Sequence, residues 1–271
     1  MAFQALTIAG SDSGGGAGIQ ADLKTFSALG VYGASVITAV TAQNTRAVTA
    51  VEMIAPAMIC AQMDAVFDDL SIAAVKVGML GGDAAIAAVA GNLATRAAPV
   101  VLDPVMVAKS GDALLACEAV NTLRTRMLPL AALLTPNLPE AARLLETAEA
   151  TDEAQMLDHG RRLLGLGPRA VLMKGGHATG DTCVDLLITP TEVIRLSAPR
   201  RATRNTHGTG CTLSAAIAAG LALGMPLTEA VRMAHAYLQG AIAAADFLKI
   251  GSGHGPVHHF HAVWPAQGAA R

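Results

Sequence analysis

The stretch Asn205-Thr-His-Gly-Thr-Gly-Cys-Thr-Leu-Ser214 runs directly into an alanine-rich apolar segment, and we start from this junction. Its two glycines permit a tight turn with positive φ and close backbone approach. The run 213–223 has the composition of a buried helix, and we expect that helix over 212–223. Unpaired N–H groups and the helix dipole make such a helix start favourable for an anion. A simple helix-capping turn is the alternative interpretation.

Cys211 lies at this expected helix start. A thiol at a helix N-terminus tends to have a lowered pKa, because the dipole favours the thiolate. We therefore expect a polarisable, reactive side chain inside the anion-binding turn.

Outward from this junction, short apolar runs alternate with helical patterns. The runs 99–102 and 170–173 are apolar throughout, which is typical of parallel strands covered by helices on both faces. Repeated alternation predicts a three-layer α/β/α sandwich with a central, mostly parallel sheet. We expect strands at 3–9, 35–41, 73–77, 100–102, 132–134 and 170–173, a strand pair at 184–188 and 192–196, and helices at 18–29, 57–70, 83–96, 115–126, 140–146, 152–164, 212–223 and 227–247.

Composition supports one globular domain over 1–271, with an irregular tail at 251–271. Of the 271 residues, 52% are hydrophobic and 15% charged, which favours a large core over disorder. A formal net charge of −2 and 3% aromatic residues argue against nucleic-acid binding. The uncharged stretches 25–45 and 208–228 are interrupted by Gly, Ser and Thr, so we expect no membrane span.

The four cysteines lie far apart and form no Cys-x-x-Cys pair. A zinc site and disulfide bonds are therefore not expected. With no basic flank of a secretory signal at residues 1–10, this pattern predicts a cytoplasmic protein.

A glycine-rich loop, 10–18, follows the first expected strand. Gly16–Ala21 formally matches a dinucleotide-binding fingerprint, but no acidic residue follows the next strand to hold a ribose. A Walker motif is absent from the loop as well. We interpret the loop as a place where backbone approaches a small flat ligand, and a plain strand–helix turn remains the alternative.

Further polar groups follow three other strands, and active sites of such sheets lie at these carboxyl ends. Asn137 and Glu140 have the spacing of a helix capping box. Glu140 also suits Mg²⁺, which prefers oxygen ligands and retains water, and Asp103 offers a second acid. Lys174 is placed to neutralise nucleotide phosphate, with Asn137 near the same phosphates.

Two other polar segments are less specific. The loop 109–112 has the character of a lid over the site. The tail histidines His258, His259 and His261 lack the cysteines or helical frame of a metal site, so we do not expect them to bind metal.

Taken together, these stretches resemble the hydroxymethylpyrimidine/phosphomethylpyrimidine kinases of thiamine biosynthesis, in the ribokinase-like superfamily. The similarity spans nearly the whole chain, in the family's order. The matching stretches are 8–25 (IAGSDSGGGAGIQADLKT), 36–45 (VITAVTAQNT), 77–80 (VGML), 102–112 (LDPVMVAKSGD), 135–140 (TPNLPE), 174–177 (KGGH) and 205–212 (NTHGTGCT).

The resemblance implies a ribokinase-like fold, a homodimer, ATP and Mg²⁺, and phosphorylation of 4-amino-5-hydroxymethyl-2-methylpyrimidine to its monophosphate and then its diphosphate. It places pyrimidine binding on Gln43, whose carboxamide offers a donor and an acceptor side by side. The roles expected for the remaining residues are these: Gly10, Asp22, Met79 and Val105 shape the pyrimidine pocket; Thr206, Thr209, Asn137 and Lys174 bind nucleotide; Glu140 and Asp103 serve the metal, with Asp103 also a catalytic acid near the transferred phosphate; and the amides of Gly208, Gly210 and Cys211 hold the transferred phosphoryl group.

Where the wider superfamily usually has aspartate, this chain has Cys211, as in the pyrimidine kinases. We expect Cys211 to act in catalysis, either as a base or beside the acceptor hydroxyl. A pyridoxal kinase on the same fold is the nearest alternative function. A catalytically inactive pyrimidine sensor and a dehydrogenase, based on Gly16–Ala21 alone, are the others.

Overall fold

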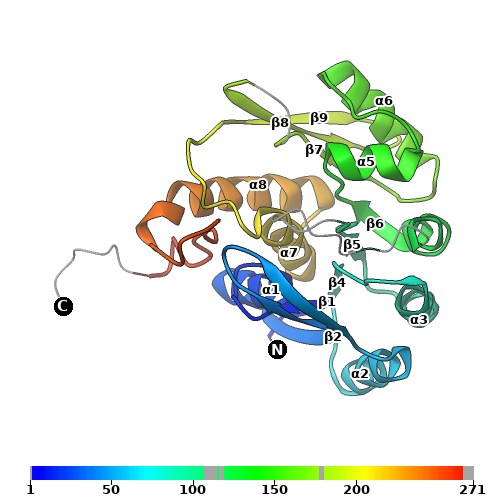
Figure 1. The fold of residues 1–271 in the computed structure, drawn as a ribbon. Helices are drawn as coiled ribbons and strands as arrows, with labels where there is room; N and C mark the ends of the chain where they lie inside the picture. Colours follow the sequence, from blue (N-terminus) through cyan, green and yellow to red (C-terminus); the bar gives the residue numbers. More distant parts are fainter. Residues whose placement is uncertain (1, 107–114, 116–118, 177–179, 265–271) are drawn as a thin grey trace.

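The computed structural model describes residues 2–106, 115, 119–176 and 180–264. In this part of the chain, strands form one sheet in the order β3-β2-β1-β4-β5-β6-β7-β8-β9 (Figure 1). The six neighbouring strands β2, β1, β4, β5, β6 and β7 are parallel to one another. Strand β3 pairs antiparallel with β2, β8 with β7, and β9 with β8. Their bounds are β1 Gln4–Asp12, β2 Tyr32–Gln43, β3 Val48–Met53, β4 Ala74–Val77, β5 Val100–Leu102, β6 Ala131–Leu134, β7 Val171–Lys174, β8 Thr182–Ile188 and β9 Val193–Pro199.

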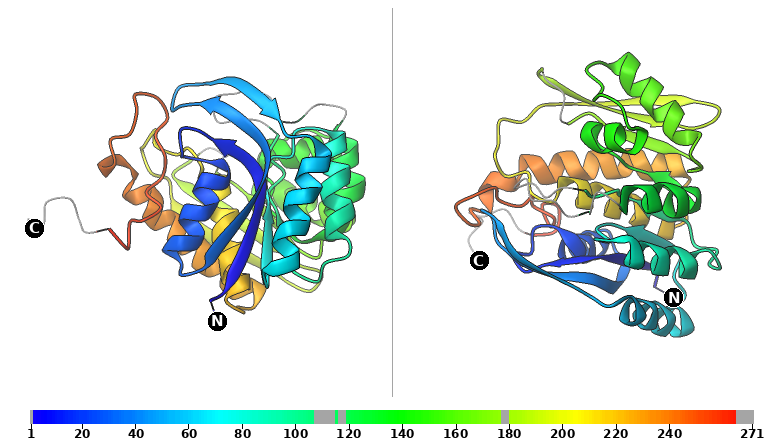
Figure 2. Two further views of the ribbon diagram at one scale, coloured as in Figure 1. Left: turned by 90° about the horizontal axis from the view of Figure 1, so that it is seen from below. Right: turned by 45° about the vertical axis from the view of Figure 1, so that its right-hand side comes forward.

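Helices cover both faces of this sheet. Helices α1 (Gly18–Ala28), α7 (Thr209–Ala222) and α8 (Leu227–Ala243) pack on one face. The other face carries α2 (Pro56–Asp69), α3 (Asp83–Leu93), α4 (Ala119–Thr122) with the π-helical turn η1 (Leu123–Met127), α5 (Leu138–Leu145) and α6 (Glu153–Leu164). Figure 2 shows the two helical layers on opposite sides of the strands. The expected three-layer α/β/α architecture is confirmed.

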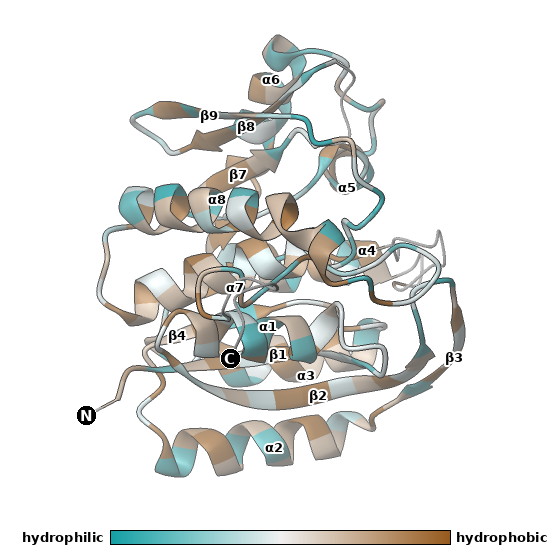
Figure 3. Cartoon of the chain, turned by 90° about the vertical axis from the view of Figure 1, so that its left-hand side faces the viewer, coloured by the Kyte–Doolittle hydropathy of each residue, from teal (hydrophilic) through white to brown (hydrophobic). Residues whose placement is uncertain are grey.

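Strand β7 shows why the central strands are apolar throughout. Val171 and Met173 point into one hydrophobic cluster, and Leu172, between them, points into the other. Both faces of the strand are thus removed from water, as the sequence of a covered parallel strand requires. Hydrophobic colours accordingly run along β7 in Figure 3.

Several elements differ from the sequence-based expectation. Helices α3 and α8 end at Leu93 and Ala243, before the expected residues 96 and 247. Strand β3 was not expected; nearly all of its residues are exposed, so it has no buried face to produce a hydrophobic pattern. The expected helix 115–126 is α4 followed by η1 and the 3-10 turn η2 (Leu128–Leu130), with residues 116–118 outside the described part. Helix α7 begins at Thr209 rather than at residue 212, which puts Gly210 inside its first turn. Among described residues, no helix combines the length and apolarity needed to cross a bilayer.

The segment 251–264 has no helix or strand, as expected for the tail, but it packs closely on the domain. Val257 and His259 are buried, with 0% and 5% exposure. Gly253 N donates to Thr45 Oγ1 (3.2 Å), and His207 N donates to Gly255 O (3.0 Å). The tail therefore joins the β2–β3 turn to the loop before α7.

His259 is expected to make the protein less stable in acid. Burial lowers its pKa to about 3, and the positive charge of Lys24 acts in the same direction. A folded-state pKa below the unfolded value of about 6.5 means that only the unfolded chain binds the proton between these values. Stability is therefore complete above pH 6.5 and falls as the pH decreases, by about 2 kcal/mol at pH 5.

Urea denaturation of the wild type and His259→Gln at pH 7.5 and pH 5 measures this contribution. Glutamine can still hydrogen-bond Thr212 Oγ1, which lies 3.1 Å from His259 Nε2, but it does not titrate. We expect the difference in unfolding free energy between the two pH values to be smaller in the variant. Equal losses in both proteins would contradict the assignment.

Candidate active site

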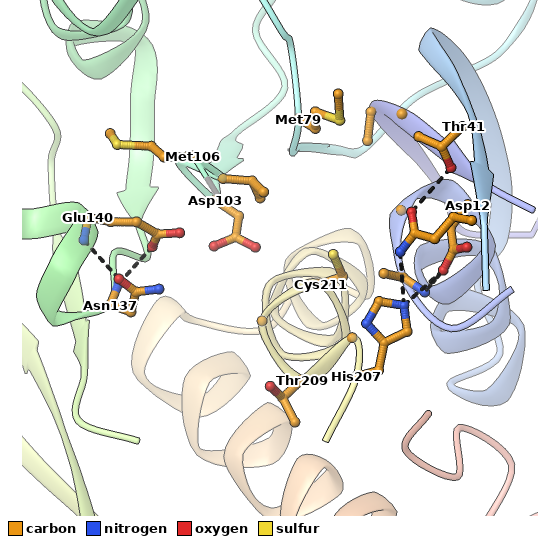
Figure 4. A pocket seen from close by; sticks show the side chains of 18 of the residues that line it. Asp12, Thr41, Met79, Asp103, Met106, Asn137, Glu140, His207, Thr209 and Cys211 are labelled. Carbon is orange, nitrogen blue, oxygen red and sulfur yellow. Dashed lines mark hydrogen bonds and ion pairs between the residues drawn. The ribbon is translucent and has the colours of Figure 1, made fainter. Parts of the chain in front are cut away.

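A cavity of about 470 Å³ opens at the carboxyl ends of β1, β4, β5, β6 and β7. Every site residue predicted from the sequence lines it, with the exception of Asp22. Figure 4 shows Asn137 and Glu140 on one side, Asp12, Thr41 and His207 on the other, and Cys211 between them. The parallel topology thus brings together motifs that are far apart in the sequence.

The turn before α7 adopts the geometry that its glycines predict. Gly208 is the N-cap with φ of 81°, and a Cβ there would lie 1.9 Å from Gly16 O. Only glycine fits both the conformation and the contact. Within α7, the first-turn amides of Gly210 and Cys211 have no carbonyl four residues earlier in the helix, which leaves them available to an anion.

Cys211 differs from expectation in its acidity. Burial raises the pKa of the thiol to about 11, although the Lys76 ammonium and a hydrogen bond from the Gly18 amide oppose that change. The expected lowering of the pKa by the helix start is therefore wrong for the ligand-free protein. Desolvation outweighs the dipole here, and the thiol is neutral at physiological pH.

On the α5 side, one lysine links two carboxylates. Lys174 Nζ donates to Asp103 Oδ1 at 2.7 Å and lies 4.0 Å from Glu140 Oε2. Asp103 is only 2% exposed and also accepts from Thr135 Oγ1 at 3.2 Å. Burial opposes its charge, but Lys174 and Lys76 together lower the pKa of Asp103, so it stays ionised.

Glu140 has both of the properties expected from its motif. Its amide donates to Asn137 Oδ1 and its carboxylate accepts from Asn137 N, each at 2.8 Å, so the predicted capping box is confirmed. Burial raises the pKa of Glu140 to about 7, with Lys174 opposing the shift. A cation that enters the cavity would therefore stabilise the ionised form of Glu140.

On the opposite side, the glycine loop wraps its amides around a carboxylate. Asp12 accepts from Gly14 N (2.8 Å), Gly16 N (3.0 Å) and Ala17 N (2.8 Å). Two amides of the dinucleotide-like fingerprint are therefore already bonded within the protein. Asp12 was not predicted as a site residue, although an acid at the start of a glycine loop is a signal of such a nest.

Asp22, predicted to line the pocket, lies beneath it. Its Oδ2 accepts from Lys76 Nζ (2.8 Å) and Thr7 Oγ1 (2.6 Å), and all three residues are fully buried. Lys76, which reaches the cavity wall, was missed from the sequence. A lysine inside the apolar strand Ala-Val-Lys-Val was the available signal, because lysine is buried only when paired. The lid loop 109–112 lies outside the described residues.

The profile of the family described as phosphomethylpyrimidine kinase matches residues 12–258. A hydroxymethylpyrimidine/phosphomethylpyrimidine kinase from Rhizobium meliloti is 61% identical over 260 residues, covering 96% of this chain and 98% of the relative.

Two solved structures are also similar. A phosphomethylpyrimidine kinase from Clostridium difficile has a TM-score of 0.79 and 46% identity, over 89% of this chain and 99% of the other. An ADP complex of Bacillus subtilis pyridoxal kinase has a TM-score of 0.90 and 35% identity, over 98% and 100%. This chain belongs to the phosphomethylpyrimidine kinase family.

Proposed function

We propose that this protein transfers the γ-phosphoryl group of ATP to the hydroxymethyl group of 4-amino-5-hydroxymethyl-2-methylpyrimidine, and then phosphorylates the monophosphate to the diphosphate. The observation that carries the proposal is one cavity with Gln43 on one wall and the first turn of α7 and Lys174 on another. The family match and the names of the relatives support the same activity.

The acceptor would bind against β2, where Gln43 ends the strand. Its carboxamide matches an aminopyrimidine edge, which offers an amine donor next to a ring-nitrogen acceptor. Gly10, Met79 and Val105 line the same cavity and supply close, mostly apolar contact for the ring. Asp22 supports this wall only indirectly, through Lys76.

The nucleotide phosphates would lie between α7 and β7. Phosphoryl transfer depends mainly on positioning and on neutralising charge. The amides of the α7 turn, with Gly208 and Gly210, would hold the transferring group, and Lys174 would neutralise its oxygens. Asn137, Thr206 and Thr209 complete the proposed nucleotide-binding set.

The donor set also fits Mg²⁺. Asp103 and Glu140 flank Lys174, and Mg²⁺ usually binds one or two carboxylates together with water and substrate phosphates. When bound, the ion would neutralise the negative charge of the nucleotide phosphates. Because burial raises the pKa of Glu140 to about 7, a nearby cation would lower that pKa and keep the side chain ionised.

Steady-state ATP consumption with purified protein tests the function. Under equal conditions, we expect kcat/KM for the hydroxymethylpyrimidine to exceed kcat/KM for pyridoxal. A preference for pyridoxal would favour the pyridoxal-kinase alternative, to which the Bacillus subtilis similarity points. Tight binding of the pyrimidine without turnover would instead identify a sensor.

Removing the Gln43 carboxamide should affect one substrate only. In Gln43→Ala, we expect calorimetric affinity for the pyrimidine to fall by about tenfold or more, since a hydrogen-bonded pair is lost from a buried edge. Affinity for an ATP analogue should stay within about twofold. Equal losses for both ligands would place Gln43 outside the acceptor site.

Cys211→Ala distinguishes a chemical role from the anion site around it. The variant keeps the helix and its amides, so we expect normal folding. We expect kcat to fall by about ten- to a hundredfold, at or below the lower limit of the usual range for a proton-transfer group, because the thiol is neutral in the ligand-free protein. A wild-type kcat would remove the thiol from the mechanism. Cys211→Ser, measured in parallel, tests whether a smaller hydroxyl restores the rate.

We also propose a cytoplasmic homodimer. Cys60 and Cys183 are free thiols, in keeping with a reducing compartment. Val40, Val51 and Met53 are 45%, 41% and 42% exposed on β2 and β3, at one edge of the sheet. An edge strand with exposed apolar side chains is suited to pairing with a second copy. Light scattering measures the mass in solution.

A further inference from the structure

Gln43 is held at both ends of its side chain. Its Oε1 lies 3.1 Å from Thr41 Oγ1 and its Nε2 lies 3.3 Å from His207 Nε2. The backbone is fixed as well, because Gln43 N donates to Ser13 Oγ (2.8 Å) and Ser13 Oγ donates to Gln43 O (2.9 Å). With the position fixed, recognition of a ligand depends on which end of the carboxamide carries the oxygen, and the hydrogen-bond partners on each side decide this.

The His207 end requires an oxygen. Asp12 accepts three backbone N–H bonds, and His207 Nε2 lies 3.0 Å from its Oδ2. Burial opposes its charge, but the bonds from His207 and the loop amides lower the pKa of Asp12. An ionised carboxylate only accepts, so His207 Nε2 carries a hydrogen and donates it. The single hydrogen on Nε2 points at Asp12, so this nitrogen has no lone pair to accept from the NH₂ group of Gln43. Two N–H groups would otherwise face each other, and the carboxamide oxygen is the end that avoids this.

The Thr41 end requires a nitrogen. Thr41 Oγ1 lies 2.9 Å from Ser11 O, a backbone carbonyl that can only accept. The single hydroxyl hydrogen of Thr41 is therefore directed at Ser11 O. The Gln43 atom beside the hydroxyl must then donate, which only the NH₂ group does.

Both contacts place the carboxamide oxygen beside His207 and the NH₂ group beside Thr41. This differs by a half-turn about the Cγ–Cδ bond from the arrangement with Oε1 beside Thr41. We propose that Asp12 and His207 are positioning residues that fix the Gln43 carboxamide, with its oxygen toward His207 and its nitrogen toward Thr41. Figure 4 shows Asp12, His207 and Thr41 together on this wall of the cavity, with dashed lines marking the interactions. Gly16 leaves room for the imidazole, since a Cβ there would lie 2.4 Å from His207 Cδ2.

The orientation decides which way the acceptor faces, and this step depends on the proposed function. The carboxamide oxygen would accept from the exocyclic amine on the His207 side, and the nitrogen would donate to the ring nitrogen on the Thr41 side. In the substrate, the amine and the hydroxymethyl group are on adjacent ring atoms. His207 directly precedes Gly208, so this orientation turns the hydroxymethyl group toward the amides of α7. The opposite orientation would turn it away.

Neutron diffraction from ligand-free crystals in D₂O tests the orientation without any reference to activity. We expect two deuterons on the Gln43 atom beside Thr41 and none on the atom beside His207. Deuterons on the atom beside His207 would overturn the inference, whatever the protein phosphorylates.

Kinetics tests the consequence for the substrate. His207→Phe keeps a planar ring against Gly16 but cannot donate, and Thr41→Val removes the other partner without changing the side-chain shape. We expect each to raise the KM for the pyrimidine by about ten- to a hundredfold, with the KM for ATP within about twofold. His207→Gln, which regains a donor, should recover part of the loss. Thr49→Val, on the exposed β3 hairpin, is the matched control and should match the wild type.

The outcomes separate the two proposals. A wild-type protein that does not phosphorylate the pyrimidine contradicts the proposed function and leaves the neutron result to decide the orientation. Turnover with an unchanged pyrimidine KM in both His207→Phe and Thr41→Val, or an equal increase for ATP, contradicts the positioning role.

Discussion

Gly208→Ala is expected to abolish most phosphoryl transfer, reducing kcat/KM by more than about a hundredfold. Two effects combine at this residue. Alanine at φ of 81° is strained, by about 1–2 kcal/mol, and its Cβ would lie 1.9 Å from Gly16 O. Because the clash is with backbone, the turn has to move, and displacing a catalytic group by about 1 Å can cost a hundredfold in rate.

The chain contains a matched control for the strain alone. Gly224, just beyond α7, has φ of 83°, and a Cβ there would contact nothing within 4 Å. Gly224→Ala should show a similar conformational cost in urea denaturation but wild-type kinetics. If Gly208→Ala retained turnover within about threefold of Gly224→Ala, the turn before α7 would not be the site of phosphoryl transfer.

Lys76→Met is expected to destabilise the protein by about 3–5 kcal/mol, the cost of leaving a buried charge without its partner. Asp22 would keep only the hydrogen bond from Thr7 Oγ1, and its Oδ1 has no partner among the described residues. Lys76 Nζ lies 2.8 Å from Asp22 Oδ2 in a fully buried ion pair. Burial raises the pKa of Asp22, with the charge of Lys76 opposing that shift, and the charge of Asp22 in turn keeps the pKa of Lys76 above its ordinary value against burial. Urea denaturation at pH 7.5 measures the change in unfolding free energy.

Two companion variants identify the cause of that loss. Lys76→Met combined with Asp22→Asn removes the unpaired charge and should recover at least half of the stability. Arg195→Ala breaks a bidentate ion pair with Glu153 that lies in solvent, and it should cost far less. If Lys76→Met were no more costly than Arg195→Ala, the buried pair would contribute little to the fold.

Sequence patterns predicted the sheet because its central strands are covered on both faces, and the resulting apolar runs are unambiguous. The same patterns placed Asp103, Glu140, Lys174 and Cys211 at the carboxyl ends of the strands, since each follows or ends a parallel strand or begins a helix there. Gln43 lines the same cavity, but its role was predicted from the family resemblance. Strand β3 escaped prediction because an exposed edge strand has no buried face to impose a pattern.

The site residues that were not predicted act through contacts with residues far away in the sequence. Lys76 and Asp22 are 54 residues apart, and Asp12 and His207 are 195 apart, so no local spacing connects them. The acidity of Cys211 was predicted in the wrong direction for a related reason. The helix start is visible in the sequence, but the desolvation that raises its pKa depends on how neighbouring elements pack around the sulfur.

The hydrogen bond from Gly253 N to Thr45 Oγ1 spans 208 residues. Together with the bond from His207 N to Gly255 O, it links the turn after Gln43 to a segment near the end of the chain. Loops this long close slowly, and a nascent chain folds as it leaves the ribosome. The part of the cavity wall around Gln43 is therefore expected to be among the last to form during synthesis. Ribosome-bound or carboxy-terminally truncated chains are expected to lack the contacts that hold it.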